Sequence, residues 1–222
     1  MTDFKTLEAI LNIINENLER KEGARETILR LTRKIVKFSS KAIKAVHNRN
    51  FKESDELLEE TRKTLTFLDE ELKKHSIFAS WGTVIQAYQE FVEAYIFRYF
   101  IEGWSEKKMP IPDVLGVPDL AYILGLGDVV GELRRYCLDR LRQKDLAEAE
   151  RALRFSNALF EGLMELNQFQ EAIIPGLRRK CDIARMVIEK TRGDLTNASA
   201  RIGLETQIKD LLKRLSKEKD FG

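Results

Sequence analysis

Apolar residues recur at intervals of three and four along nearly the whole chain, and no stretch shows the strict alternation of a half-buried strand. This spacing predicts an all-α fold. Prolines, glycines and polar clusters divide the pattern into about seven helices, with breaks expected near Gly23 and Gly193. The expected ranges are Phe4–Arg20, Arg25–His47, Lys52–Lys74, Ile77–Gly103, Pro118–Lys144, Leu146–Asn167 and Pro175–Gly193, with a last one from about Ala200 to Lys217. Short connections favour antiparallel neighbours, as in a helical bundle.

The segment KKMPIPDVLGVPD interrupts this pattern, because it holds three of the four prolines. Proline lacks a backbone N–H and cannot continue a helix, so the segment is expected to be a connector. Such a connector could separate two domains. The helices on both sides, however, have apolar faces too broad for either half to cover alone. We therefore expect residues 1–222 to form a single all-helical domain.

The helix expected at Ile77–Gly103 is apolar around most of its circumference, which is typical of a buried helix. Gln86, Glu90 and Glu93 nevertheless form one polar stripe on it, because positions three and four apart share a helix face. A buried carboxylate is costly unless it takes a proton or acquires a cation. The pattern therefore indicates that something neutralises the two glutamates.

The helix after the connector repeats this feature in the stretch LGLGDVVGELRRYCL. Asp128 and Glu132 lie four apart among aliphatic residues, and Arg135 continues their stripe. If the two helices face each other, four carboxylates converge, and an oxygen-only ligand set of this kind suits Mg²⁺ or Mn²⁺. Gly127 and Gly131 beside the acids are expected to let another helix approach closely.

A metal cluster of this type commonly serves phosphoryl chemistry, so the residues predict a hydrolase acting on a phosphoester or a phosphoanhydride. The alternative is that the acids form ion pairs with Arg98, Arg134, Arg135 or lysines. A di-iron site is disfavoured because the two histidines, His47 and His75, lie far from both acidic stripes.

A basic stripe follows the second expected helix, ARETILRLTRKIVKFSSKAIKAVH, at spacings of four, three, four and three. Its members are Arg30, Lys34, Lys37, Lys41 and Lys44. Such a stripe could track a nucleic-acid backbone by neutralising successive phosphates. It could equally be a solvated face, or pair with the acids of the next helix. A second basic group, which is less regular, comprises Arg178, Arg179, Lys180 and Arg185.

The overall composition adds few constraints. The net charge of +2 is too balanced to indicate a nucleic-acid binder by itself, so the distribution of charge must decide. The N-terminus lacks the pattern of a signal peptide, which favours a cytoplasmic protein. No membrane span is expected, because Glu90, Glu93 and Arg98 would each cost roughly 2.5–3.5 kcal/mol inside a bilayer. Cys137 and Cys181 stand alone and are interpreted as buried thiols.

Taken in order, several stretches resemble the translin superfamily, and most closely its translin-associated factor X branch and the single-component archaeal relatives. These stretches are QEFVEA, LGLGDVVGELRRYC after the proline-containing connector, a helix ending in LFEGL, and IPGLRRKCDIARMVIEKTRG. ARETILRLTRKIVK and IKAVH fit the family's first long helix. The resemblance covers most of the chain.

The resemblance implies an all-α subunit of about seven helices that assembles into a closed homo-oligomer, typically of eight subunits, enclosing RNA. It also implies a Mg²⁺-dependent endoribonuclease whose catalytic acids fall on Glu90, Glu93 and Asp128, with Glu132 as a further acid of the site. Translin itself lacks these acids and binds RNA or single-stranded DNA without supplying the active site.

The sequence therefore predicts an endoribonuclease in which Glu90, Glu93, Asp128 and Glu132 hold one or two Mg²⁺ (or Mn²⁺) ions. The residues expected to bind RNA are Arg25, Arg30, Lys34, Lys37, Lys41, Lys44 and Arg135. Three alternatives stay open at this point. One is a non-catalytic translin-like holder of RNA or single-stranded DNA, and another is an all-α nucleoside triphosphate pyrophosphohydrolase with similar acidic helix pairs. The third is a purely structural helical oligomer, which would have no salt-dependent affinity for nucleic acid.

Overall fold

The computed structural model describes residues 2–103 and 108–219, and these form helices without a single strand, so the all-α prediction is confirmed. Seven α-helices lie in the described ranges. Their bounds are α1 Thr2–His47, α2 Phe51–Lys74, α3 Gly82–Ile101, α4 Pro112–Leu115, α5 Asp119–Arg142, α6 Leu146–Glu165 and α7 Leu177–Lys219. Two short 3₁₀ turns, Ser76–Phe78 and Leu166–Gln168, follow α2 and α6.

The chain divides into two compact units, Met1–Gly125 and Leu126–Gly222, with the boundary inside α5 rather than in the connector. Each unit is described by itself below. The single domain expected from the sequence stays a prediction.

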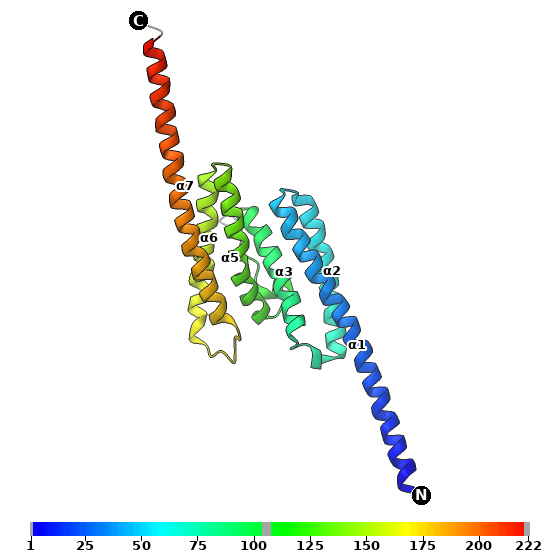
Figure 1. Ribbon diagram of the computed structural model, residues 1–222. Helices are drawn as coiled ribbons and strands as arrows, with labels where there is room; N and C mark the ends of the chain where they lie inside the picture. The colour runs from blue at the N-terminus through cyan, green and yellow to red at the C-terminus, as the bar shows by residue number, and fades with distance from the viewer. Residues whose placement is uncertain (1, 104–107, 220–222) are drawn as a thin grey trace. The chain divides into compact units, whose positions relative to one another are not determined.

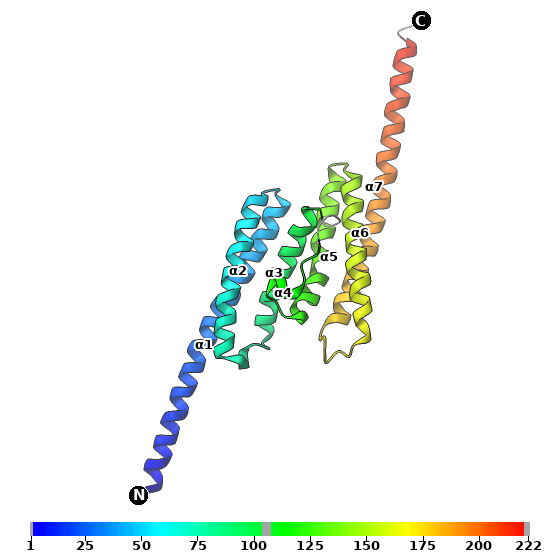
Figure 2. The same ribbon diagram turned by 180° about the vertical axis from the view of Figure 1, so that it is seen from behind.

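In the first unit, α1, α2 and α3 lie side by side (Figures 1 and 2). Their shared core includes Ile28 and Ile35 of α1, Leu68 of α2, and Phe91 and Phe97 of α3, none of which is exposed to solvent. Helix α1 packs against both α2 and α3, and α3 contributes buried residues from most of its circumference. The turn at residues 48–50 reverses the chain, so α1 and α2 run antiparallel.

The prediction of a break at Gly23 was wrong, because α1 continues from Thr2 to His47. A glycine ends a helix when it adopts the left-handed conformation, with positive φ. Gly23 does not, whereas Gly103 and Gly116 do, at φ of 102° and 68°. The flanking residues of Gly23 are good helix formers, and their propensity offsets the cost of about 1 kcal/mol for a glycine inside a helix.

The proline-containing segment is a connector, as expected, although α4 adds a single turn to it. Lys107 at its start lies outside the described residues. Gly116 ends α4, and the hydroxyl of Tyr122 donates a hydrogen bond of 2.6 Å to the carbonyl of Pro110. This bond ties the connector to the first turn of α5.

In the second unit, α6 and α7 pack along each other, and α5 contributes its part from Leu126 onward. Asp145 caps α6 by accepting a hydrogen bond from the backbone N–H of Glu148, at 3.2 Å. The predicted end at Gly193 was wrong, because α7 runs unbroken from Leu177 to Lys219. Gly193, like Gly23, does not have a positive φ.

None of the helices in the described residues combines the length and the apolar character needed to cross a membrane.

Candidate functional site

Helix α3 carries the first acidic pair. Phe91, Val92 and Ile96 on this helix are completely buried, whereas Glu90 and Glu93 are partly exposed at the edge of the apolar surface. Neither glutamate is without an interaction partner. The stripe expected from the sequence is therefore present on one helix of the first unit.

Helix α5 carries the second acidic pair, in the second unit. Asp128 accepts a hydrogen bond from Nζ of Lys180 on α7, and both side chains are mostly buried. Gly127 makes this contact possible, because a Cβ at that position would lie 3.2 Å from Cβ of Lys180. The close approach of a helix expected at Gly127 is thus confirmed. At Gly131 it was wrong, since no atom lies within 4 Å of the site of a Cβ there.

Glu132 lies one turn beyond Asp128 and is also mostly buried, with 23% of its side chain exposed. Nη1 of Arg135 lies 3.9 Å from its carboxylate, and the Arg135 side chain is largely exposed. The ion-pair alternative raised by the sequence therefore applies to Asp128, through Lys180, and more weakly to Glu132.

Two of the arginines expected to compete for the acids, Arg98 and Arg134, have other partners. Arg98 pairs with Asp55 and Glu102, at 2.8 and 2.9 Å. Arg134 donates hydrogen bonds to Thr191, at 3.0 Å, and to Asp194, at 2.7 Å.

The described residues contain no group of three or more His, Cys, Asp or Glu side chains arranged to hold a metal ion. The four predicted metal ligands are divided equally between the two units. Glu90 and Glu93 lie one turn apart on α3, and Asp128 and Glu132 lie one turn apart on α5. A site composed of all four stays a prediction.

The basic stripe lies on the exposed side of α1, and its five members are all exposed. Within residues 2–103 and 108–219, none of the five makes an ion pair with a carboxylate. The acids of α2 pair elsewhere, for example Glu60 with Lys63 at 2.9 Å and Asp55 with Arg98. The hydrogen bond from Lys63 lowers the pKa of Glu60, with a smaller contribution from Lys34.

Arg25, which the family resemblance also suggested for RNA binding, pairs with Glu22 at 2.7 Å. Both side chains are largely exposed, so this i,i+3 pair is weak and would not prevent Arg25 from binding a phosphate.

A groove between α1 and α3 brings basic residues close to the acidic stripe. It has a volume of about 410 Å³, and Arg33 and Lys37 line it from α1, with Thr83 and Gln86 on the α3 side. Gln86 precedes Glu90 by one helical turn. The groove therefore joins positive charge on α1 to the α3 face that carries Glu90.

Arg33 is a residue that the sequence prediction missed. It is exposed, and it lies three residues after Arg30 and four before Lys37. The spacing of Arg30, Arg33 and Lys37 is thus as regular as the stripe that was predicted. This second stripe could be read from the sequence. Only the position of α3, however, shows that Arg33 and Lys37 line the groove next to the acidic stripe.

The comparisons with known proteins agree in pointing to one family. The Translin family model matches residues 23–192. The uncharacterized protein MJ0175 of Methanocaldococcus jannaschii is 33% identical over 213 residues, which cover 94% of this chain and 91% of that protein.

Solved structures give the same result. The chain is similar to AfC3PO in a complex with duplex RNA, with a TM-score of 0.74 and 32% identity over 86% of this chain and 97% of that one. A crystal structure of AfC3PO alone gives a TM-score of 0.73 with the same identity and coverage. Apo-NeC3PO gives a TM-score of 0.75 and 26% identity over 85% of this chain and 96% of that one.

Proposed function

Because the chain belongs to the Translin family, we propose that it binds RNA and cleaves it as a Mg²⁺-dependent endoribonuclease. The similarity to AfC3PO, solved with duplex RNA, supports the choice of ligand. The observation that carries the catalytic part is the presence of two carboxylate pairs, on α3 and α5, in otherwise apolar helical surroundings. We further propose a closed homo-oligomer, of eight subunits as in the family, and single-stranded DNA as a further ligand.

The unpaired lysines of α1 support RNA binding. Lys37, Lys41 and Lys44 are exposed and make no ion pair within the described residues, so they would exchange mobile counterions for phosphates. Arg33 would add a planar guanidinium, which can bind two phosphate oxygens at once. Hydroxyl and amide groups of Thr83 and Gln86 would complete the contacts on the other side of the groove.

The chemistry of the acidic residues fits a hard divalent cation. Glu90, Glu93, Asp128 and Glu132 would supply carboxylate oxygens only, and such ligands suit Mg²⁺ better than they suit zinc or iron. A bound Mg²⁺ would supply Lewis acidity to the scissile phosphate and lower the pKa of a coordinated water. The carboxylates would hold this charge in place, and the apolar residues around them would limit the access of bulk water.

Lys180 has a specific role in this proposal. It neutralises Asp128 while no divalent ion is bound, which avoids an unpaired charge in a mostly buried position. If Asp128 held a divalent ion instead, the ammonium group of Lys180 would be free to donate hydrogen bonds to a phosphate oxygen. The same residue would thus stabilise the empty site and bind the substrate.

The test is cleavage of a labelled RNA duplex with Mg²⁺, with EDTA, and by the double variant Glu90→Gln, Glu93→Gln. We expect Mg²⁺-dependent cleavage that falls by at least 100-fold in the variant, because the amides would no longer bind the cation. RNA affinity should stay within about twofold of the native value, since the groove on α1 is unchanged. Cleavage that survives both EDTA and the double substitution would refute the assignment.

A non-catalytic RNA holder is the second candidate, and the ion pair between Lys180 and Asp128 favours it. A carboxylate with a permanent lysine partner needs no metal. In that case the protein would bind RNA and show no cleavage with any divalent ion. Replacing Lys180 by Met would lower its stability and leave its RNA affinity unchanged.

A further inference from the structure

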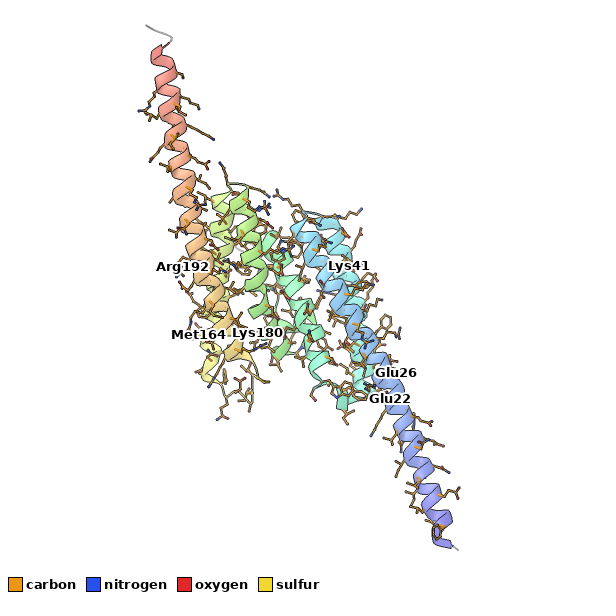
Figure 3. All side chains as sticks on the ribbon, in the orientation of Figure 1. Glu22, Glu26, Lys41, Met164, Lys180 and Arg192 are labelled. Carbon is orange, nitrogen blue, oxygen red and sulfur yellow. The ribbon has the colours of Figure 1, made fainter. Side chains whose placement is uncertain are left out.

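The groove between α1 and α3 is lined by neutral polar groups as well as by cations. Ser40 lies on the α1 side, directly before Lys41, which Figure 3 labels, and Thr83 and Gln86 lie on the α3 side. We call Ser40, Thr83 and Gln86 the neutral set. All three side chains are exposed, and none of them makes a hydrogen bond within the described part of the chain. Their hydrogen-bonding groups are therefore available to a ligand.

Several other hydroxyls of this chain are occupied by their own helix. Thr32, which also lines the groove, donates to the carbonyl of Leu29 at 3.0 Å. Thr61 and Thr64 on α2 donate to carbonyls four residues earlier, at 2.7 and 2.8 Å. Such a bond is a common arrangement for a serine or threonine inside a helix. Ser40 lies inside α1 without it, so its hydroxyl can both donate to a ligand and accept from one.

The cations of the groove indicate where a phosphate would bind. Arg33 and Lys37 come from α1 and make no ion pair in the ranges that the structure describes. Lys37 precedes Ser40 by three positions, so the two residues share a face of α1. A phosphate held by Lys37 would therefore place the adjoining sugar beside the hydroxyl of Ser40.

The same groove lacks the groups on which bases are usually recognised. Among its described lining residues none has an aromatic ring, on which a base could stack, and none is a carboxylate, which could accept from an amino group of a base. Val36 adds an apolar surface, which suits the carbon atoms of a sugar. The groove thus matches the sugar and phosphate of a nucleotide better than its base.

The 2′-hydroxyl is the group that distinguishes ribose from deoxyribose, and it is both a donor and an acceptor. In duplex RNA it lines the wide, shallow minor groove, where side chains reach it together with the phosphates. Hydroxyl and amide side chains complement it in either direction, whereas lysine and arginine only donate. The neutral set therefore supplies the acceptors that the cations of the groove lack.

We propose that the neutral set binds 2′-hydroxyls of RNA and makes the groove selective for ribose over deoxyribose. The inference rests on the proposed function in taking RNA as the ligand, and it adds the residues that distinguish RNA from DNA. It does not depend on cleavage. Gln86 lies one helical turn before Glu90, so the sugars recognised are those next to the acidic stripe of α3.

The test compares the affinity of the protein for three duplexes of one sequence, made of RNA, of RNA with 2′-fluorine in place of every 2′-hydroxyl, and of DNA. Fluorine cannot donate a hydrogen bond but leaves the duplex in the A-form, so it separates loss of the hydroxyl from a change of shape. Fluorescence anisotropy with EDTA measures binding without cleavage. We expect native protein to bind RNA about fivefold more tightly than 2′-fluoro RNA, because one net hydrogen bond contributes about that factor.

The variant Thr83→Val with Gln86→Met removes two members of the neutral set and keeps the size of both side chains nearly unchanged. It should bind RNA more weakly and lose most of the preference for RNA, while its affinity for the 2′-fluoro duplex stays native. Ser40→Ala should show a smaller loss in the same direction. The control, Thr66→Val with Gln143→Met, makes the same changes at exposed positions outside the groove and should keep the native affinities.

Salt dependence provides a second readout. The neutral set carries no charge, so the slope of log affinity against log salt concentration should stay native in the variants although their affinity for RNA falls. A slope that fell together with the affinity would mean that the substitutions had displaced Arg33 or Lys37. The neutral set would then have no role of its own, and the inference would be refuted.

The comparison of duplexes can also overturn the inference. Native protein that bound RNA and 2′-fluoro RNA equally would show that the 2′-hydroxyl is not recognised. A preference for RNA that persisted unchanged in Thr83→Val with Gln86→Met and in Ser40→Ala would assign it to other residues. Absence of any affinity for RNA would refute RNA binding as well. Selectivity for ribose that depended on the neutral set, without cleavage when Mg²⁺ is added, would support the inference and contradict only the catalytic part of the proposed function.

Discussion

Gly125, in the first half of α5, lies against α3. A Cβ at this position would lie 2.7 Å from Cβ of Val92 and 2.9 Å from the backbone oxygen of Gln89. Since a backbone atom in a packed helix cannot move aside cheaply, Gly125→Ala is expected to destabilise the protein by about 1–3 kcal/mol. Denaturant unfolding measures the change.

Gly131 provides the matched control on the same helix. It is exposed and no atom lies within 4 Å of the site of its Cβ, so Gly131→Ala should stabilise the protein by about 0.5–1 kcal/mol. If both variants moved stability in the same direction, the close approach of α5 to α3 would not be the reason for the glycine at position 125.

The buried thiols give a prediction about pH at the residue scale. Burial raises the pKa of Cys137 to about 11, and it also raises the pKa of Cys181. Only the thiolate reacts, and at pH 8 about one Cys137 in a thousand would be ionised. Native protein should therefore react with a thiol reagent no faster than it unfolds, while denatured protein reacts at both cysteines. Rapid labelling of native protein at pH 8 would contradict the buried positions.

At the scale of elements, the N-terminus of α6 is held by Glu148. Arg151 and the hydroxyl of Tyr136 donate hydrogen bonds to its carboxylate, at 2.8 and 3.0 Å. These bonds, chiefly the one from Arg151, lower the pKa of Glu148 below its usual 4.5. A carboxyl whose pKa is lower in the folded state stabilises the fold above the unfolded pKa, and this contribution is lost as pH falls through the folded pKa.

Glu148→Gln should therefore cost stability at pH 7, by about 1 kcal/mol because the pair is partly exposed, and much less at pH 3. Urea unfolding at both pH values measures the difference. The control is Glu150→Gln, which alters an exposed carboxylate 4.0 Å from Arg154 and should change little at either pH. A cost for Glu148→Gln that did not depend on pH would indicate lost packing instead of lost charge.

The extent of the helices shows what the sequence can and cannot predict. Apolar spacing correctly predicted the helix type throughout and the ends of α2, because periodicity and caps are local. The predicted lengths of α1 and α7 were wrong. Nothing in the local sequence distinguishes Gly23 and Gly193, which continue a helix, from Gly103 and Gly116, which follow the end of one. They differ in φ, and φ depends on whether the chain has to turn at that point. The packing that requires a turn involves residues distant in sequence.

The candidate site was likewise predictable from the sequence only in part. The carboxylates at positions 90, 93, 128 and 132 could be identified because each pair interrupts an apolar helix. The partner of Asp128 could not, because Lys180 lies 52 residues further along and reaches Asp128 only through the packing of α7 on α5. Contacts within one helix follow from spacing, whereas contacts between helices require the fold.

At the scale of the whole molecule, the net charge of +2 conceals a sorted distribution. The lysines of α2 largely pair with neighbouring glutamates, as Lys63 does with Glu60 and Lys74 with Glu71. The five residues of the basic stripe on α1, and Arg33 beside them, make no ion pair in the described ranges. Composition could not separate these two groups, since both consist of exposed lysines and arginines on amphipathic helices.

This difference leads to a prediction about RNA binding and salt. Arg33→Ala with Lys37→Ala removes two charges from the groove next to Gln86, and with them two expected phosphate contacts. Each neutralised phosphate contributes about 0.7–0.9 to the slope of log affinity against log salt concentration, so the loss of two contacts should lower the slope by roughly 1.4–1.8. Fluorescence anisotropy of a labelled RNA duplex over a range of salt concentrations measures it.

Lys52→Ala with Lys74→Ala is the control, because it removes the same charge from α2, where both lysines lie beside glutamates. The two double variants have equal net charge, so an effect of overall charge would change their slopes equally. A change confined to the Arg33 and Lys37 variant would place the phosphates in the groove between α1 and α3. Equal changes would mean that RNA senses only the total charge of the surface, and the groove would lose its assigned role.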